Sequence, residues 1–159
     1  MNEPWIEIVA RLALSVVVGA VIGLNRDLHR KQAGVRTNAL VSLGAALAVL
    51  VVAPPGIDDA HHVDAMSRVI QGVLTGIGFL GAGVILRDPE SRRVSGLTTA
   101  AAIWLAALLG VASGAGAYVA VATALVLGLV AVAWGGPFEK WFRRLTGTPS
   151  RKSADDTDA

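Results

Sequence analysis

The sequence predicts an all-α fold, an integral membrane bundle of five transmembrane helices with the N-terminus outside and the C-terminus in the cytoplasm. The 159-residue chain is 53% hydrophobic and only 16% charged, whereas ordinary soluble domains carry roughly 25% charged residues. Its apolar residues form five runs, each close to the roughly 17–25 residues that cross a bilayer as a helix. The basic residues gather in alternate loops between these runs, which is typical of membrane topology.

The start of the chain, MNEPWIEIVAR, is acidic, and no small-residue cleavage pattern follows it. The first apolar run is therefore interpreted as a span and not as a signal peptide. The second and fourth runs are short, so the polar residues that open them must lie at or inside the membrane interface. The expected spans of one transmembrane domain, residues 1–145, are 5–24, 37–54, 68–86, 97–113 and 116–135.

Two features are expected after the last span. The segment PFEKWFRRL, residues 137–145, has the composition of a short basic amphipathic helix on the inner membrane surface. Residues 146–159 are polar and are expected to form a disordered cytoplasmic tail.

Loop charge predicts the orientation. The 25–37 and 87–96 loops are rich in Arg and Lys, whereas the 55–67 loop carries three Asp residues and no Lys or Arg. Because Lys and Arg are retained on the cytoplasmic side, the basic loops are expected inside the cell. Aromatic residues fall near both expected interfaces, but Trp104 falls in the middle of a span and is expected to pack in the core.

Residues 71–87 read QGVLTGIGFLGAGVILR and contain the spacing G-x-G-x-x-G. A dinucleotide-binding turn needs a preceding strand and a later acidic residue, and an apolar span precedes this one. On a helix these glycines divide between two opposite faces, and G-x-x-x-G pairs at 19/23, 72/76 and 110/114 indicate close helix crossing. The sequence predicts that the third span is central and that neighbouring helices approach it closely on both sides. The alternative is that this segment is unwound and lines a binding site with its backbone. The glycines concerned are Gly72, Gly76, Gly78, Gly81 and Gly83.

A polar group is expected at the cytoplasmic ends of the first four spans. The second and fourth spans begin there, so two helix N-termini with free N–H groups point to the same side. In one interpretation the Thr and Asn residues only cap these helices. In the other, they line a pocket for an anionic group or partner, with Arg26 or Arg36 held by Asp27. The members are Asn25, Arg26, Asp27, Arg36, Thr37, Asn38, Arg87, Thr98 and Thr99.

Carboxylates are almost absent from the spans. Because Mg²⁺ is usually held by carboxylates and waters, and membrane cation relays use buried acids, a dedicated cation pathway is disfavoured. Arg11 is expected to snorkel or to pair with Glu7, four residues earlier. The pair of histidines His61 and His62 beside Asp64 is a weak metal candidate, since adjacent histidines are poorly placed to share one ion.

No nucleophile–base pair or catalytic carboxylate pair is recognisable, and the chain has no Cys. We therefore expect neither an enzyme nor a cofactor. The basic residues lie in short blocks between apolar runs and not on one face, so no nucleic-acid partner is expected either.

Three stretches resemble the signature of the MgtC/SapB membrane-protein family: GLNRDLHRKQAGVRTNALVSLGAA (23–46), GIGFLGAGVI (76–85) and GLTTAAAIW (96–104). The resemblance implies a multi-pass protein of the bacterial inner membrane that is linked to growth under magnesium limitation. For this family both direct Mg²⁺ transport and regulation of other membrane proteins have been proposed. The matching positions are Arg26, Gly34, Arg36, Thr37, Asn38, Arg68, Gly76, Gly78, Gly81, Gly83, Gly96, Thr98 and Thr99.

The sequence departs from the family pattern at three positions. Asn25 stands where glutamate is usual, Gly72 where glutamine is usual (beside Gln71), and Ser95 where arginine is common. The missing glutamate further weakens a cation-binding role. Many members of the family also carry a soluble C-terminal domain, which is not expected in this sequence.

The favoured interpretation is a MgtC/SapB-type inner-membrane protein that acts under magnesium limitation or envelope stress. It would work by helix–helix contact with itself, as a homodimer, or with another membrane protein. The alternative is a transporter or channel for Mg²⁺ or another small solute, using the polar group or an unwound third span. The expected partners are the lipid bilayer and a second copy of the chain.

Overall fold

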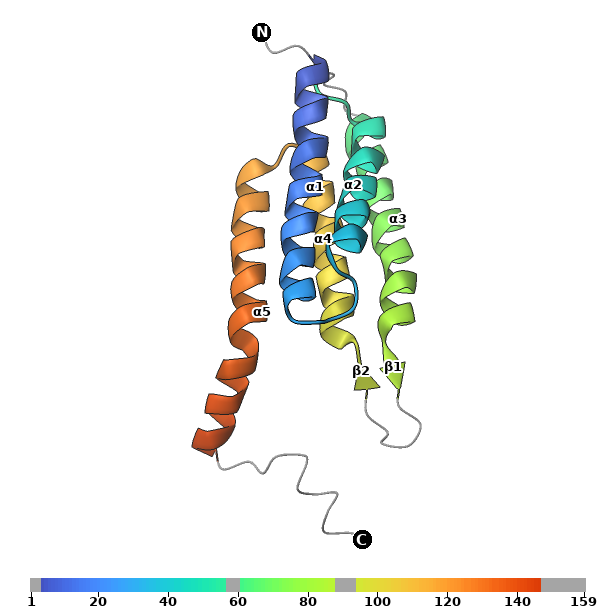
Figure 1. Cartoon of the computed structure of the whole chain (residues 1–159). Coiled ribbons are helices and arrows are strands. Elements are labelled where there is room, and N and C mark those ends of the chain that lie inside the picture. Colours follow the sequence, from blue (N-terminus) through green and yellow to red (C-terminus); the bar gives the residue numbers. More distant parts are fainter. Residues whose placement is uncertain (1–3, 57–60, 88–93, 147–159) are drawn as a thin grey trace. The chain divides into compact units, whose positions relative to one another are not determined.

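The computed structural model describes residues 4–56, 61–87 and 94–146. These residues form an all-helical fold with one small two-stranded sheet, so the all-α prediction is confirmed. Met1–Leu125 makes one compact unit and Val126–Ala159 a second; every interhelical contact given below lies in the first. Figure 1 labels the elements, which are α1 (Pro4–Leu28), α2 (Val35–Val52), α3 (His61–Val84), β1 (Leu86–Arg87), β2 (Val94–Ser95), α4 (Leu97–Gly114) and α5 (Tyr118–Thr146).

The central helix is α4, which packs extensively against α2 and α1, and these two also pack against each other. Glycines let the three backbones approach closely. A Cβ added to Gly110 would lie 2.1 Å from the backbone oxygen of Ser42, and one added to Gly19 would lie 2.4 Å from that of Asn38. Close crossing was predicted for the pairs in the first and fourth spans, and the structure confirms it. Helices α1, α2 and α4 thus form a three-helix core.

Helix α3 lies at the edge of this core, mainly against α4 and less extensively against α2. In an apolar stretch of 18 residues, only 11% of α3 is buried, whereas the corresponding share for α4 is 56%. The prediction that the third span is central is therefore wrong. The helical periodicity identified which residues share a face of α3, but it did not predict which helices lie against each face. Large apolar residues on one face attach α3 to the core.

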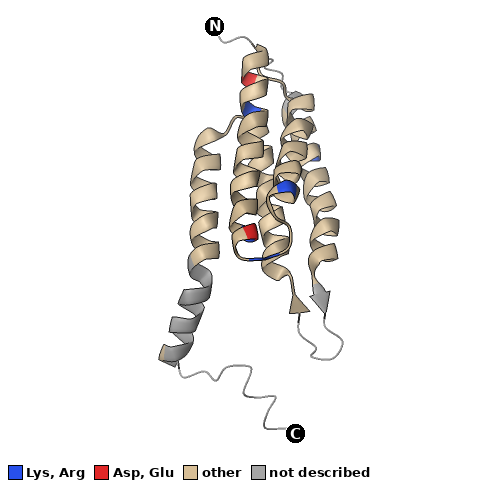
Figure 2. Cartoon of the chain, viewed as in Figure 1, with Lys and Arg blue, Asp and Glu red and all other residues tan. Residues whose placement is uncertain are grey.

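Four of the described helices, α1 to α4, are long and apolar enough to cross a membrane, and α5 contains a shorter apolar stretch, Tyr118–Ala133. Charged residues are sparse along their described parts (Figure 2). The helix α5 continues without a break through Pro137 to Thr146. A separate surface helix over residues 137–145 is therefore not formed, because the apolar and basic segments share one continuous backbone. The predicted tail, beyond Thr146, lies outside the described residues.

The turn from α3 to α4 contains an antiparallel pair that the sequence did not predict. Leu86 of β1 lies opposite Ser95 of β2, and Arg87 lies opposite Val94. Gly96 then enters α4 with a φ of 88°, and a Cβ at this position would lie 1.9 Å from the backbone oxygen of Val84. Only glycine adopts this conformation readily and leaves that space free. This turn fixes where α4 begins and so positions its first residues.

Candidate functional site

The candidate site lies where α1 ends and where α2 and α4 begin, an end of the bundle that we call the basic end (residues 25–38 and 94–99). Helix α1 extends to Leu28, past the predicted end of its span. The connection to α2 contains two non-glycine residues in the left-handed region, Arg30 at a φ of 51° and Ala33 at 56°. Such conformations persist only where surrounding contacts hold them. The connection is therefore tightly determined.

Arg26 is the central residue of the basic end. It lies in the last turn of α1, is only 4% exposed, and donates from Nη2 to Thr99 Oγ1 in the first turn of α4 at 2.5 Å. Its Nε is buried and has no hydrogen-bond partner. Among the described residues the one ion pair is Arg11 with Glu7, so Arg26 is a buried cation without a carboxylate. Arg26 and Thr99 together join α1 to α4.

Asp27 does not hold Arg26 or Arg36 in the described structure. Its Oδ2 instead accepts a hydrogen bond of 3.0 Å from the backbone N–H of Val35, at the first turn of α2. A negative charge here also interacts favourably with the helix dipole of α2. Gly34 makes room for this contact, because a Cβ there would lie 1.8 Å from Asp27 Oδ1. The expected ion pair is thus replaced by a cap from the neighbouring helix.

Asn38 is fully buried in α2 and faces the connection. Its Nδ2 donates to the backbone oxygens of Ala33, at 2.5 Å, and Gly34, at 3.0 Å, while its Oδ1 has no partner. The residues at the N-cap positions of α2 and α4 are Gly34 and Gly96, and neither helix has a side-chain cap at that position. The expectation that Thr and Asn residues cap these helices is therefore wrong. Asn38 holds the connection instead.

The remaining members of the predicted polar group do not join this centre. Arg36, Thr37 and Thr98 are exposed, and Asn25 is partly buried. The backbone of Arg87 belongs to β1, where it pairs with Val94 of β2 and not with a helix terminus. The structure thus brings together Arg26 with Thr99, and Asn38 with the connection, but not the whole predicted group.

The glycines predicted to pack in the third span are mostly open in the structure. A Cβ added at Gly72, Gly76, Gly78 or Gly83 would meet no atom within 4 Å, and at Gly81 it would meet only Ala100 Cβ, at 3.6 Å. Helix α3 is also continuous from His61 to Val84. Within the described residues, α3 is therefore neither approached closely on both sides nor unwound. The small residues leave a bare outer surface instead.

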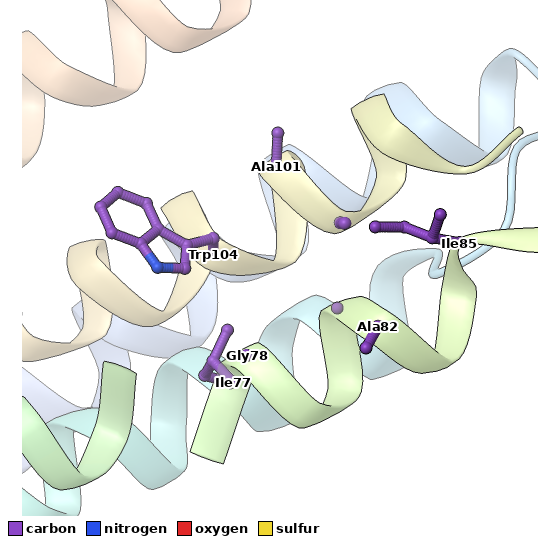
Figure 3. Close-up of a pocket in the computed structure, with 8 residues that line it drawn as sticks. Ile77, Gly78, Ala82, Ile85, Ala101 and Trp104 are labelled. Atoms are coloured by element: carbon purple, nitrogen blue, oxygen red, sulfur yellow. The ribbon is translucent and has the colours of Figure 1, made fainter. Parts of the chain in front are cut away.

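An apolar groove of about 350 Å³ lies between α3 and α4, beside Gly78 and Gly81 and not beside Gly72, Gly76 or Gly83. Figure 3 shows Trp104 and Ala101 of α4 on one side, and on the other Gly78 and Ala82 of α3 together with Ile85, which directly follows that helix. Trp104 is 46% exposed, so the expectation of a packed core tryptophan is wrong. Its ring lies beside the groove because small residues on α3 leave it uncovered.

A second polar group lies at the opposite end of the three-helix core. Arg11 Nε donates to Glu7 Oε1 at 2.8 Å, as predicted, and Arg11 Nη1 donates to the backbone oxygen of Gly114 at 2.9 Å. The Tyr118 hydroxyl donates to the same Glu7 oxygen at 2.5 Å. The four-residue spacing predicted the pair of Glu7 and Arg11, but the tyrosine is 111 residues away from Glu7 and was not predicted to join it. This group links α1 to the end of α4 and the start of α5.

Asp64 is exposed in the first turn of α3, which also contains His61 and His62. In the part of the chain that the structure describes, no group of three His, Asp or Glu residues is arranged to hold a metal ion. The described residues of this turn therefore supply no metal centre on their own.

Comparison with known proteins assigns the chain to a family. The model of the MgtC family matches residues 12–141. The chain is 49% identical over 119 residues to Protein SrpB of Synechococcus elongatus, covering 70% of this chain and 65% of that protein. It is 34% identical to Protein SapB of Bacillus subtilis, covering 94% of this chain and 63% of that protein.

A third relative, from Escherichia coli K12, bears the name "Putative magnesium transporter YhiD"; it is 39% identical, with 70% of this chain and 53% of that protein covered. The chain thus spans about half to two thirds of the length of these three relatives. No solved structure matches it. The helical membrane architecture and the match over most of the sequence lead to one assignment: the chain belongs to the MgtC family of membrane proteins.

Proposed function

We propose that this chain is a non-enzymatic protein of the bacterial inner membrane that acts by helix–helix contact, with itself or with another membrane protein, under magnesium limitation or envelope stress. The observation that carries the proposal is the bare outer surface of α3. A Cβ added at Gly72, Gly76 or Gly83 would meet no atom within 4 Å, and Phe79 on the same face is 82% exposed. Small residues at such a surface let another helix approach closely, which is how helices associate in lipid.

The proposal includes five membrane crossings with the basic end in the cytoplasm. The apolar stretch Tyr118–Ala133 is shorter than the other four, but α5 continues to Thr146 and its helix is long enough to span. The concentration of Arg and Lys in the connection after α1 supports the orientation.

Transport of Mg²⁺ or another small solute is the second candidate, favoured by the name of the Escherichia coli relative. Two observations argue against a path through the three-helix core of this chain. Backbone atoms fill the space beside Gly19, Gly23 and Gly110, and Arg26 places a cation at the basic end without a carboxylate partner among the described residues. A positive charge at that position opposes entry of Mg²⁺.

A flux measurement separates the two candidates. The purified chain is placed in liposomes that contain a Mg²⁺-sensitive dye, and we expect the signal to equal that of protein-free liposomes. Flux that is lost in Arg36→Ala or Asn38→Ala would support transport and contradict the proposal.

The proposed contact surface can be tested by growth of a host that lacks its own member of the family, in medium with limiting magnesium. Gly76→Ile should abolish the growth advantage that the chain gives, because a branched side chain blocks the approach of another helix. Gly44→Ile on α2 is the matched control, since that glycine is also exposed and a Cβ added there would also meet no atom within 4 Å. Equal growth with both variants would contradict a role for the α3 surface.

A further inference from the structure

Four polar residues form a stripe along the outer side of α3. Asp64, Arg68, Gln71 and Thr75 are all exposed, and their spacing of four, three and four places them on one face of a helix. The opposite face carries Met66, Val69, Ile70 and Val73, which pack against the core residues Ala45, Val49 and Val111. The polar stripe, defined as these four residues, therefore points directly away from the chain.

The stripe begins at Asp64 in the first turn of α3, and its other three residues lie farther along this apolar helix. Val63–Val84 is a candidate membrane span. The four apolar residues on the opposite face of α3, named above, contact core residues of α2 and α4. Polar side chains at this depth are costly when they face lipid and normally face another helix or a water-filled cavity. A long arginine can reach the interface by snorkelling, but the shorter glutamine one turn deeper has much less reach.

Most of the stripe has no partner within the described residues. Thr75 Oγ1 donates to the backbone oxygen of Gln71 at 2.8 Å and is satisfied. In the described part of the chain, by contrast, the side chains of Asp64, Arg68 and Gln71 make no hydrogen bond or ion pair. Asp64 and Arg68 are four residues apart and opposite in charge, yet the structure leaves them separate.

We propose that the polar stripe is the contact surface between two copies of this chain, with Arg68 of one copy paired with Asp64 of the other and the two Gln71 amides meeting near the two-fold axis. Copies in one membrane share one orientation, so a two-fold axis along the membrane normal brings equivalent positions of α3 together. An amide both donates and accepts, so it can pair with its own copy. The adjacent Gly72 and Gly76 let the backbones come close.

This assignment rests on the proposed function, because it identifies the partner in the proposed helix contact as a second copy. Charge complementarity decides the identity of the partner. The stripe carries one acid and one base a single turn apart, so a copy of itself supplies the opposite charge for each.

The first test uses the absence of Cys from the chain. Thr75→Cys puts one thiol in the stripe, and Leu47→Cys puts one on the exposed outer side of α2 as the control. Oxidation in native membranes should give disulfide-linked dimer for Thr75→Cys at low expression, and little for Leu47→Cys. Equal yields, or a cross-link from position 75 only to a different protein, would overturn the proposal.

The second test exchanges charges in the Thr75→Cys background. Arg68→Asp makes the stripe wholly acidic and Asp64→Arg makes it wholly basic, so each variant alone should lose about tenfold in dimer yield, the change that roughly 1.4 kcal/mol of lost pairing produces. Co-expression of the two variants should restore the mixed dimer. A charge pair within one helix would not be restored by mixing, so failure of restoration overturns the assignment.

These outcomes are distinct from failure of the proposed function. A Mg²⁺ flux through liposomes would contradict the proposed function without affecting the cross-linking result. Conversely, a cross-link from the stripe to another membrane protein would leave the proposed function standing and reject the second copy as partner.

Discussion

At the scale of single residues, Arg26 has the most unusual environment in the described structure. It is 4% exposed, bonds one hydroxyl, and keeps an unpaired Nε. A buried charge without a counter-ion is costly, and replacing it by an apolar residue of similar volume is often neutral or stabilising. A residue that lowers stability in this way is a candidate for function, because such arrangements concentrate at functional sites.

Thr99→Val should destabilise the chain by about 1–3 kcal/mol, because it removes the one partner that the described residues offer to a buried guanidinium. Thr98→Val is the matched control: Thr98 is the exposed neighbour, and surface changes usually stay within about 0.5 kcal/mol. The free energy of unfolding in detergent micelles gives both values.

The same measurement in an Arg26→Met background completes a double-mutant cycle. We expect Thr99→Val to cost little there, because no guanidinium remains to be left unpaired. An equal cost in both backgrounds would show that Thr99 stabilises the helix end independently of Arg26.

At the scale of helices, the three-helix core depends on two pairs of glycines. Gly110→Ala would place a Cβ 2.1 Å from the backbone oxygen of Ser42, and backbone cannot move aside cheaply. We expect a loss of at least about 2 kcal/mol, as for other overpacked cores. Gly44→Ala, in open space on α2, should instead stabilise by roughly 0.5–1 kcal/mol through helix propensity. A small effect at Gly110 would mean that α2 and α4 separate readily.

The helices also show what the sequence could and could not predict. Apolar length was sufficient to predict the helices, and G-x-x-x-G correctly indicated close crossing at Gly19/Gly23 and Gly110/Gly114. The same spacing at Gly72/Gly76 faces outward, because a spacing pattern identifies a face but not the helix that covers it. Whether another copy covers that face stays a prediction.

The polar group illustrates a second limit. The sequence placed Arg26 and Thr99 at the same end of the bundle because loop charge and helix direction determine the ends. It did not predict that they touch, since they are 73 residues apart and their contact depends on how far α1 continues beyond its apolar run. Asp27 was expected to pair with an arginine, but it caps the first turn of α2 instead. This contact depends on the path of the connection between α1 and α2, which the spacing of residues in the sequence does not predict.

At the scale of the whole molecule, the described part of the first unit divides its roles between elements. Helices α1, α2 and α4 form a core that is closed by backbone contacts, while α3 carries glycines, a polar stripe and a groove on surfaces the chain does not cover. A protein built for permeation needs an open path through its interior, whereas one built for association needs an uncovered face. The arrangement of the described helices supports the proposed role in association.

The orientation of the molecule decides which compartment the basic end faces, and it can be measured directly because the chain has no native Cys. Gln32→Cys, exposed in the connection after α1, and Ala117→Cys, exposed between α4 and α5, probe opposite ends. A membrane-impermeant maleimide should label Ala117→Cys in intact spheroplasts and Gln32→Cys only after permeabilisation, because the Arg and Lys residues around position 32 hold that connection in the cytoplasm. Both thiols must react in detergent, which controls for local accessibility. Labelling of Gln32→Cys in intact spheroplasts would reverse the orientation and place Arg26 at the outer face, where the cytoplasm could supply no ligand to it.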